Sequence, residues 1–352
     1  MPRRRVARLD LVRVIHEAIV EAGGAIPFAE FQRLALYGPD GFYMRGDGGQ
    51  AGRRRGSFLT SPEVGPLFGA VLARYLDHTW TALGEPSPFV VVDAGAGPGT
   101  LARSVLAARP ACAAAMHYVA VEVSAVQRRD HPAGVESRAD MPAGRFDGVV
   151  VANELLDNLP FRLCVFDGSW REAFVAVGTD GTFVEVLSAP LEPVTAVLPA
   201  APALGTRAPL QTEAAEWLVD ATGRLGAGRV LAIDYADAST AALARRPWRE
   251  WLRTYRQHER GDHYLHRPGS QDITAEVALD QFPEPVAVRT QAQFLQRWGI
   301  DQLVTDGDTY WAAHAARPDL AALAMRSRAV EAAALTDGAG LGAFLAIEWA
   351  AG

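Results

Sequence analysis

A glycine-rich turn in the first third of the chain is the segment best suited to hold a ligand. It reads Asp93-Ala94-Gly95-Ala96-Gly97-Pro98-Gly99-Thr100 and directly follows a short β-branched run. Glycines in such a turn adopt positive φ and let the backbone approach a ligand closely. In an open parallel sheet, ligands bind at the carboxyl ends of the strands. We therefore predict that Asp93, Gly95, Gly97 and Gly99 contact a cofactor, although glycine-rich turns also occur for structural reasons alone.

The spacing of these glycines favours one kind of cofactor. A dinucleotide fingerprint, G-x-G-x-x-G, would place its last glycine at position 100, which is Thr100 here. The observed pattern, G-x-G-x-G after an acidic residue, resembles motif I of class I methyltransferases, which bind S-adenosyl-L-methionine. That resemblance implies that Glu122, at the end of the next predicted strand, accepts hydrogen bonds from both ribose hydroxyls. An NAD(P)-dependent oxidoreductase remains an alternative, disfavoured by the position of Gly99.

Acidic residues follow the third buried run of the chain. Asn153-Glu154 comes directly after Phe146–Ala152, and Asp157 follows three residues later. Burying a carboxylate at this edge is costly unless it is paired. Glu154 and Asp157, one helical turn apart, could share a face and accept hydrogen bonds from a guanidinium. The alternative is a structural ion pair.

Several segments together resemble one family, the MidA-type methyltransferases, whose mitochondrial members assist complex I assembly by methylating an arginine. The segments are 27–31, 36–43, 58–69, 93–100, 153–160 and 271–275. The resemblance implies that S-adenosyl-L-methionine is the cofactor and that the acceptor is an arginine or another cationic or polar group of a protein or peptide.

The same resemblance assigns further site residues. Thr60 and Ser61 are expected near the methionine end of the cofactor, and Glu63 among the other cofactor-binding residues. Ser61-Pro62 is also a good helix start without any ligand. Asn153 and Glu154 are expected beside the cofactor, with Glu154, Asp157 and Asp272 acting on the acceptor. A non-catalytic S-adenosylmethionine-binding assembly factor remains the second alternative.

One loop departs from the family. Relatives continue the 271–275 segment with His-Val-Asp-Phe, whereas this chain has Glu276-Val277-Ala278-Leu279. We expect the acceptor, or the way it is presented, to differ accordingly, because Glu276 adds a carboxylate and Ala278 removes one. The alternative is that both positions lie outside the pocket and affect only the surface of the loop.

The elements that must position these residues indicate an α/β fold. Buried apolar runs at 89–93, 117–122, 146–153 and 229–235 alternate with helical segments, which predicts a doubly wound, mostly parallel, Rossmann-like sheet. Residues 162–166 and 182–187 are typical of antiparallel hairpins. We expect the following organisation: an N-terminal helical region (1–88), the first part of the core (89–160), a hairpin and connector insertion (161–227), a core strand (228–236), a helical lid insertion (237–340) and a closing strand (341–352).

Composition excludes several classes of protein. The chain has 352 residues and no lysine, so a Schiff-base enzyme and a P-loop NTPase are excluded. The net charge of −7 and the lack of a long basic stripe argue against a nucleic-acid partner. No apolar run is long enough to span a membrane. Two distant cysteines and no signal peptide favour a cytoplasmic protein without a disulfide framework, and no metal site is expected. A homodimer is compatible with these features.

Overall fold

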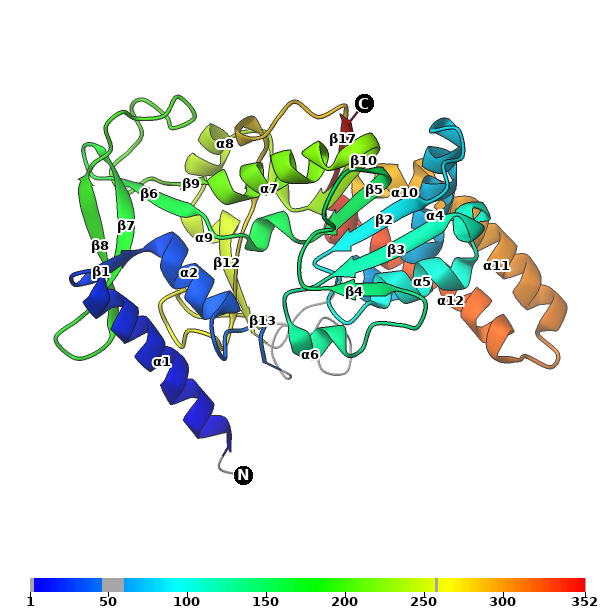
Figure 1. Cartoon of the computed structure of the whole chain (residues 1–352), viewed down its shortest axis with the longest axis horizontal. Coiled ribbons are helices and arrows are strands. Elements are labelled where there is room, and N and C mark those ends of the chain that lie inside the picture. Colours follow the sequence, from blue (N-terminus) through cyan, green and yellow to red (C-terminus); the bar gives the residue numbers. More distant parts are fainter. Residues whose placement is uncertain (1–2, 46–59, 257–258, 352) are drawn as a thin grey trace.

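The chain was analysed as a computed structural model that describes residues 3–45, 60–256 and 259–351, with side chains from residue 11 onward. Within these residues, seven strands form the main sheet of a mixed α/β fold (Figure 1). Their order across the sheet is β16 (Ala287–Thr290), β17 (Leu345–Ala351), β10 (Leu225–Asp234), β5 (Phe146–Asn153), β2 (Phe89–Ala94), β3 (Met116–Val121) and β4 (Glu136–Arg138).

The central strands of the main sheet are parallel. β2 pairs in parallel with β3 and β5, and β5 pairs in parallel with β10. β17 is antiparallel to both of its neighbours, β10 and β16. The four predicted buried strands are confirmed as β2, β3, β5 and β10. Their continuous apolar side chains are buried on both faces, as expected for central parallel strands.

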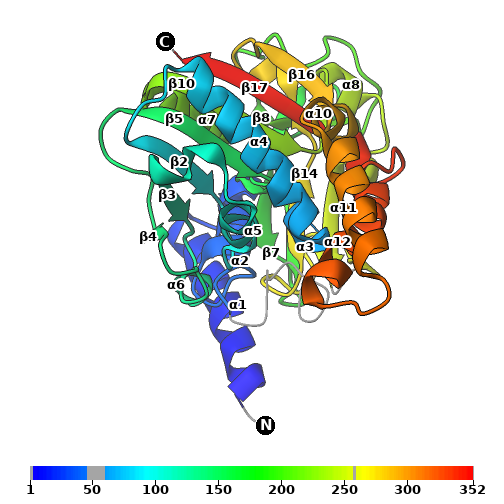
Figure 2. The same cartoon turned by 90° about the vertical axis from the view of Figure 1, so that its right-hand side faces the viewer.

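Helices cover both faces of this sheet. Five helices pack on one face: α4 (Pro66–Ala82), α5 (Thr100–Ala108), α10 (Gln291–Arg297), α11 (Ile300–His314) and α12 (Leu320–Leu335). The other face is covered by α7 (Thr212–Gly223), whose buried residues Ala214, Leu218 and Ala221 contact the sheet. Figure 2 shows α4 crossing in front of the strands with α11 and α12 beside it.

A second sheet lies beside the first, on the left in Figure 1. Its strands are β1 (Ala25–Pro27), β6 (Arg162–Phe166), β7 (Trp170–Val177), β8 (Phe183–Pro190) and β9 (Arg207–Leu210). The predicted hairpins are confirmed, because β7 pairs antiparallel with both β6 and β8. Two helices, α1 (Arg3–Glu21) and α2 (Phe28–Tyr37), pack against this sheet. The expected N-terminal helical region is therefore interrupted by a strand, since β1 separates α1 from α2.

The remaining elements are short. Three short strands, β12 (Leu252–Arg256), β13 (Glu259–Arg260) and β14 (Asp272–Ala275), form a small sheet, and β11 (Ala236–Asp237) pairs with β15 (Val277–Ala278). The short helices are α3 (Ser61–Val64), η1 (Ala111–Ala114), α6 (Ala125–Arg128), η2 (Leu156–Asn158), α8 (Thr240–Ala244), α9 (Trp248–Trp251), η3 (Leu279–Gln281) and η4 (Leu341–Ala343).

The structure corrects three of the expected segment boundaries. Residues 237–340 are not one lid, because β16 lies in the main sheet and α10 to α12 pack on it. Residues 1–88 are divided between the sheets, since β1 joins the second sheet and α4 covers the first. Residues 161–227 include α7, which also covers the main sheet. The last strand is present, but β17 lies between two strands and does not form the edge.

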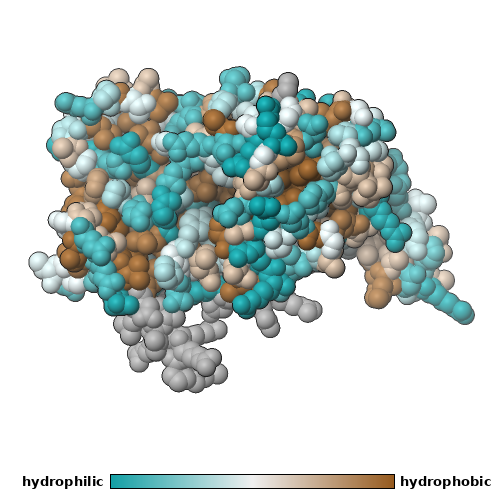
Figure 3. Space-filling view, viewed as in Figure 1, coloured by the Kyte–Doolittle hydropathy of each residue, from teal (hydrophilic) through white to brown (hydrophobic). Residues whose placement is uncertain are grey.

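The surface carries both hydrophilic and hydrophobic residues over the face shown in Figure 3. Exposed large apolar side chains include Val184 and Val186 on β8, and Leu320 and Val330 on α12. Of the described helices, none is both long and apolar enough to cross a membrane.

Candidate active site

A cavity of about 640 Å³ opens at the carboxyl ends of β2, β3 and β5. β2 precedes both of its neighbours in the chain, so the strand order reverses beside it. This is where open α/β sheets bind ligands. The volume lies within the range of roughly 300–1,000 Å³ typical of small-molecule sites.

The glycine turn forms one wall of the cavity. Gly95, Gly97 and Gly99 adopt φ of 73°, 54° and 78°, a conformation that L side chains rarely adopt. Gly95 and Gly97 line the cavity. Gly99 does not line it, because it begins α5 and packs against His131 and Pro132. Gly99 therefore does not contact the cavity as predicted, and its role is to shape the turn.

Two acidic residues at strand ends line the same wall. The carboxylate of Glu122 accepts hydrogen bonds from the backbone N–H groups of Gly97 (3.0 Å) and Ser124 (2.7 Å), one on each oxygen. Each oxygen keeps a second acceptor position. Asp93 accepts a hydrogen bond from the hydroxyl of Tyr118 (3.0 Å), and burial raises the pKa of Asp93 to about 7.

Buried acceptor atoms without partners also belong to this wall. Among the described residues, Asn153 Oδ1 and Gln127 Oε1 have no hydrogen-bond partner, and both residues line the cavity. An unsatisfied buried acceptor costs about 1–3 kcal/mol. The wall around Glu122 and Asp93 is therefore suited to a ligand rich in hydrogen-bond donors.

The Ser-Pro-Glu segment forms a further part of the cavity wall. Thr60 and Glu63 line the cavity. Ser61 does not, because its fully buried hydroxyl donates to Oε1 of Gln291 at 2.7 Å. The helix that starts here is α3, of four residues only. Its N-cap is Thr60 without a side-chain cap, so Ser61 is not the capping residue.

Glu154 occupies the end of β5 on the cavity wall. Its φ of 52° lies in the left-handed region, which is uncommon for residues other than glycine. Asn153 Nδ2 donates to the carboxylate at 3.1 Å. Burial, together with the negative charge of Asp157, raises the pKa of Glu154 to about 8. The backbone of Ser61 hydrogen-bonds the same carboxyl group and opposes this rise.

Asp157 lies behind Glu154 and does not line the cavity. Its carboxylate accepts hydrogen bonds from the side chains of Thr274 and Asn158, the latter at 2.8 Å. Burial raises its pKa to about 6. The backbone N–H of Asp157 donates to the fully buried Asp234, whose pKa burial also raises. The predicted two-carboxylate clamp on one helical face is wrong, because a 3₁₀ turn follows Glu154 and turns Asp157 toward Thr274.

Asp272 also lies behind the cavity wall. Its Oδ1 accepts from the hydroxyl of Tyr43 (3.0 Å), which also lies 2.9 Å from Asn158 Oδ1. Burial raises the pKa of Asp272 to about 7. Tyr43 lines the cavity, and its ring is stacked on Tyr37, with 5.6 Å between ring centroids. Asp272 therefore reaches the cavity only through Tyr43.

Sequence reasoning did not select several residues that line the cavity. Tyr37, Tyr43, Arg33 and Glu213 are among them, with Asp140 after β4. Arg33 on α2 forms a bidentate ion pair with Glu213 on α7, at 2.5 and 3.0 Å. Asp140 carried a local signal, since it follows a strand as Glu122 does, and Tyr37 and Tyr43 belong to the 36–43 segment of the resemblance. Arg33 and Glu213 are brought together by long-range folding.

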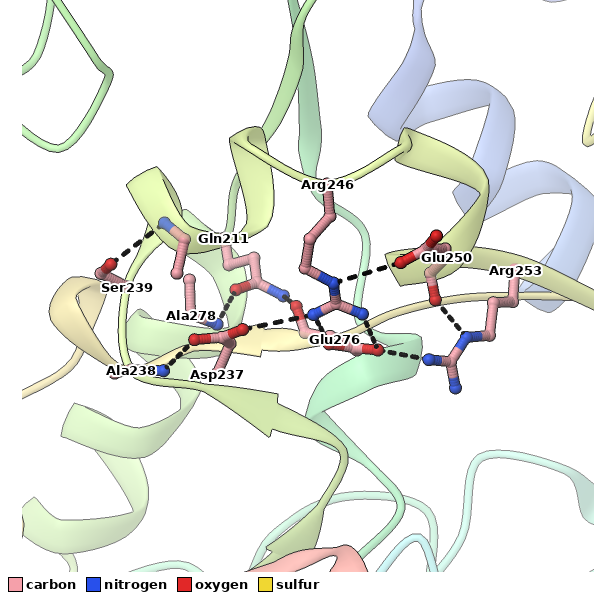
Figure 4. Close-up of polar contacts among 10 residues, drawn as sticks. Gln211, Asp237, Ala238, Ser239, Arg246, Glu250, Arg253, Glu276 and Ala278 are labelled. Carbon is pink, nitrogen blue, oxygen red and sulfur yellow. Dashed lines mark hydrogen bonds and ion pairs between the residues drawn. The ribbon is translucent and has the colours of Figure 1, made fainter. Parts of the chain in front are cut away.

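The 276–279 loop, whose sequence differs from that of the family, does not add a free carboxylate to the site. Figure 4 shows Glu276 between two arginines, with Arg246 bound in a bidentate pair at 2.7 and 3.0 Å and Arg253 on the same carboxylate. Glu276 is 8% exposed, and neither it nor the fully buried Ala278 lines the cavity. Both positions therefore lie outside the cavity, as the alternative held, but they are buried and do not form the surface of the loop. A changed acceptor stays a prediction.

Comparisons with known proteins agree with this geometry. The model of a family described as S-adenosyl-L-methionine-dependent methyltransferase matches residues 71–295. The Drosophila melanogaster protein arginine methyltransferase NDUFAF7 homolog, mitochondrial, is 29% identical over 296 residues, covering 72% of this chain and 65% of that protein. The rat protein arginine methyltransferase NDUFAF7, mitochondrial, is 25% identical over 331 residues, covering 80% and 72%. The chain thus spans slightly less than two thirds of the fly relative.

A solved structure is similar over almost the whole chain. It is a Burkholderia thailandensis protein bound to S-adenosyl-homocysteine, 27% identical, with a TM-score of 0.83 over 99% of this chain and 93% of that one. The family match covers more than half of the chain, and the cavity lies at the glycine turn within it. The chain belongs to this family of S-adenosyl-L-methionine-dependent methyltransferases.

Proposed function

We propose that this protein transfers the methyl group of S-adenosyl-L-methionine to a guanidinium nitrogen of an arginine in a protein or peptide. The single observation that carries the acceptor class is a group of buried carboxylates at one end of the cavity. Glu154 lines the cavity, with Asp157 and Asp272 behind it, and burial raises the pKa of all three. An entering cation would offset the cost of ionising them. The names of the fly and rat relatives support the same acceptor.

The sheet supports a class I methyltransferase assignment. Its central strands are parallel, helices cover both faces, and β17 is the antiparallel strand inserted next to β10. We assign the main sheet as the doubly wound cofactor-binding part. The second sheet, with α1 and α2, and the small sheet of β12 to β14 are assigned as the part that covers the acceptor.

The residues at the glycine-turn side of the cavity form a binding site that fits the cofactor. Glu122 has two free acceptor positions for the ribose hydroxyls, and Asp93 is a carboxylate for the amino group. Asn153 Oδ1 and Gln127 Oε1 are unsatisfied acceptors for further donors. Gly95 and Gly97 allow the backbone to approach the ligand closely. When bound, the cofactor supplies a methyl group that its positively charged sulfur makes electrophilic.

The acceptor end of the cavity would orient a guanidinium. Glu154 accepts its N–H groups, and the stacked rings of Tyr37 and Tyr43 offer flat faces that attract cations. The acceptor nitrogen forms the new bond to the methyl carbon while the bond from carbon to sulfur breaks, with its electron pair remaining on sulfur. The nitrogen then loses a proton, which Glu154 can take or pass to water. Alignment of nitrogen, carbon and sulfur supplies much of the rate gain.

The test is methyl transfer to arginine-containing peptides, read by mass shift, with Glu154→Gln as the deciding variant. We expect the variant to bind S-adenosyl-homocysteine as the wild type does and to lose at least about 100-fold in single-turnover rate. In the wild type, the kcat/KM for the peptide should rise with pH toward about 8, where free Glu154 ionises. Unchanged turnover in Glu154→Gln would contradict the proposal. Cofactor binding without transfer to any arginine would favour a non-catalytic binding factor.

A further inference from the structure

The Ser-Pro-Glu wall of the cavity is held from the C-terminal third of the chain. The wall runs from Thr60 to Leu67 and contains α3, the Gly65 linker and the first turn of α4. A four-residue helix is not stable alone in water. Its position must therefore be fixed by contacts with the rest of the protein.

One anchor is the side chain of Gln291, the first residue of α10. Its Oε1 accepts from the hydroxyl of Ser61 at 2.7 Å, and its Nε2 donates to the carbonyl of Leu335 at 2.9 Å. Gln291 and Ser61 are both fully buried. A buried amide with both ends satisfied fixes its partners strongly, because breaking either bond leaves an unpaired polar group.

The other anchor is Glu331 on α12, a carboxylate that is 5% exposed. Its Oε2 accepts from the backbone N–H of Leu67 at 2.9 Å, and its Oε1 accepts from the hydroxyl of Ser327. Leu67 lies in the first turn of α4, a helix of 17 residues. A carboxylate is favoured at this end of a helix by the free N–H groups and by the helix dipole.

Gly65 permits this contact. A Cβ atom at position 65 would lie 2.2 Å from the carboxyl carbon of Glu331. Any side chain there would push the carboxylate away from Leu67. The absence of a side chain at Gly65 therefore allows the carboxylate of Glu331 to reach the first turn of α4.

We infer that Glu331 and Gln291 are positioning residues of the active site, holding the Thr60–Gly65 wall against the cofactor and against Glu154. The inference rests on the proposed function of this cavity. Thr60, Pro62 and Glu63, which line the cavity, directly flank or follow Ser61, the residue held by Gln291. Ser61 also lies close enough to the carboxyl group of Glu154 to lower its pKa, so a displaced wall would disturb both the cofactor side and the acceptor side of the cavity.

The test compares Glu331→Ala with Glu331→Gln and with Val330→Ala, a control at the neighbouring, 70% exposed position of α12. We expect Glu331→Ala to weaken S-adenosyl-homocysteine binding about tenfold by calorimetry below its unfolding temperature, with faster amide exchange from Ser61 to Leu67. Glu331→Gln should restore most of the affinity, because its amide oxygen still accepts from Leu67. Val330→Ala should match the wild type in both measurements.

Faster exchange in Glu331→Ala with unchanged affinity would show a purely structural role and overturn the inference. If Glu331→Ala does not fold, the test uses Ser61→Ala, which deletes only one buried oxygen. An affinity of Ser61→Ala for S-adenosyl-homocysteine within twofold of that of the wild type would overturn the inference. If the wild type does not bind S-adenosyl-homocysteine, the proposed function is refuted instead. Independently, unchanged amide exchange from Ser61 to Leu67 in Ser61→Ala would refute the role of Gln291 as an anchor.

Discussion

The hydroxyl of Thr274 donates a hydrogen bond to the carboxylate of Asp157, 117 positions earlier in the chain. Thr274 lies on β14, where it pairs with Arg253 of β12. Asp157 follows β5 of the main sheet. This one contact ties the small sheet to the carboxyl edge of the main sheet, next to Glu154. The acceptor end of the cavity is therefore built by segments of both parts of the fold.

Replacing Glu122 by alanine should weaken S-adenosyl-homocysteine binding by about 1–3 kcal/mol, because the ribose hydroxyls lose their acceptors. The N–H groups of Gly97 and Ser124 lose theirs as well. Calorimetry would measure the change, with Glu136→Ala on the neighbouring strand as the control, because Glu136 is a partly exposed, ion-paired carboxylate outside the cavity lining. Tight binding of NADH by the wild type, with no response to S-adenosyl-homocysteine, would refute the assignment of the cavity.

Binding of S-adenosyl-homocysteine should weaken as pH falls below about 7. The pKa of Asp93 is about 7 in the free protein because the carboxyl is buried, so the group is largely protonated at lower pH. An ammonium group on the ligand binds the ionised form better, and binding should release a proton. Titrations at pH 6 and pH 8 in two buffers would measure this release. A pH dependence that is unchanged in Asp93→Asn would assign it to another group.

The carboxylates near Glu154 should make the free protein less stable as pH rises. The pKa of Asp272 is raised from its ordinary value near 4 to about 7, so the folded state binds a proton more tightly than the unfolded state. Its contribution to stability is present below pH 4 and is lost as pH rises through 7. Asp272→Asn should therefore gain stability relative to the wild type, by about 1–3 kcal/mol between pH 5 and pH 8. Thermal unfolding at both pH values measures this, and a constant difference would contradict it.

Glu276→Gln should destabilise the fold by about 2–4 kcal/mol, because Arg246 and Arg253 lose a largely buried charged partner. Glu250→Gln is the matched control, since Glu250 is exposed and contacts Arg246 at 3.6 Å. Urea unfolding gives both values. A change in the KM for the acceptor peptide without loss of stability would instead return Glu276 to the acceptor site.

Local sequence patterns predicted the cofactor side of the cavity well. Asp93, Gly95, Glu122 and Asn153 all end or follow buried parallel strands, and the carboxyl ends of such strands meet at one edge. Periodicity and turn chemistry select Asp93 and Gly95, whereas Glu122 and Asn153 are selected by the resemblance to known methyltransferases. Gly99 was misassigned because spacing does not show whether a turn glycine faces a ligand or a neighbouring loop.

The acceptor side was predicted less completely, for a physical reason. Helical spacing placed Glu154 and Asp157 on one face, but the left-handed φ of Glu154 and the following 3₁₀ turn separate them. The partners that fix Asp157 and Asp272 are Thr274 and Tyr43, more than 100 positions away from each. Neither contact can be predicted from the periodicity of the sequence, because the partners are far apart in the chain.

The position of β17 has a consequence for synthesis. β10 and β16 pair with opposite edges of β17. Both strands precede β17 in the sequence, so the ribosome synthesises them first. Until residues 345–351 leave the ribosome, β10 has one unpaired edge and β16 has no neighbour in the sheet. Open strand edges invite pairing with other chains. Folding of the main sheet must therefore finish after translation of its last strand, and nascent chains that stall before Leu345 should be targets for chaperones.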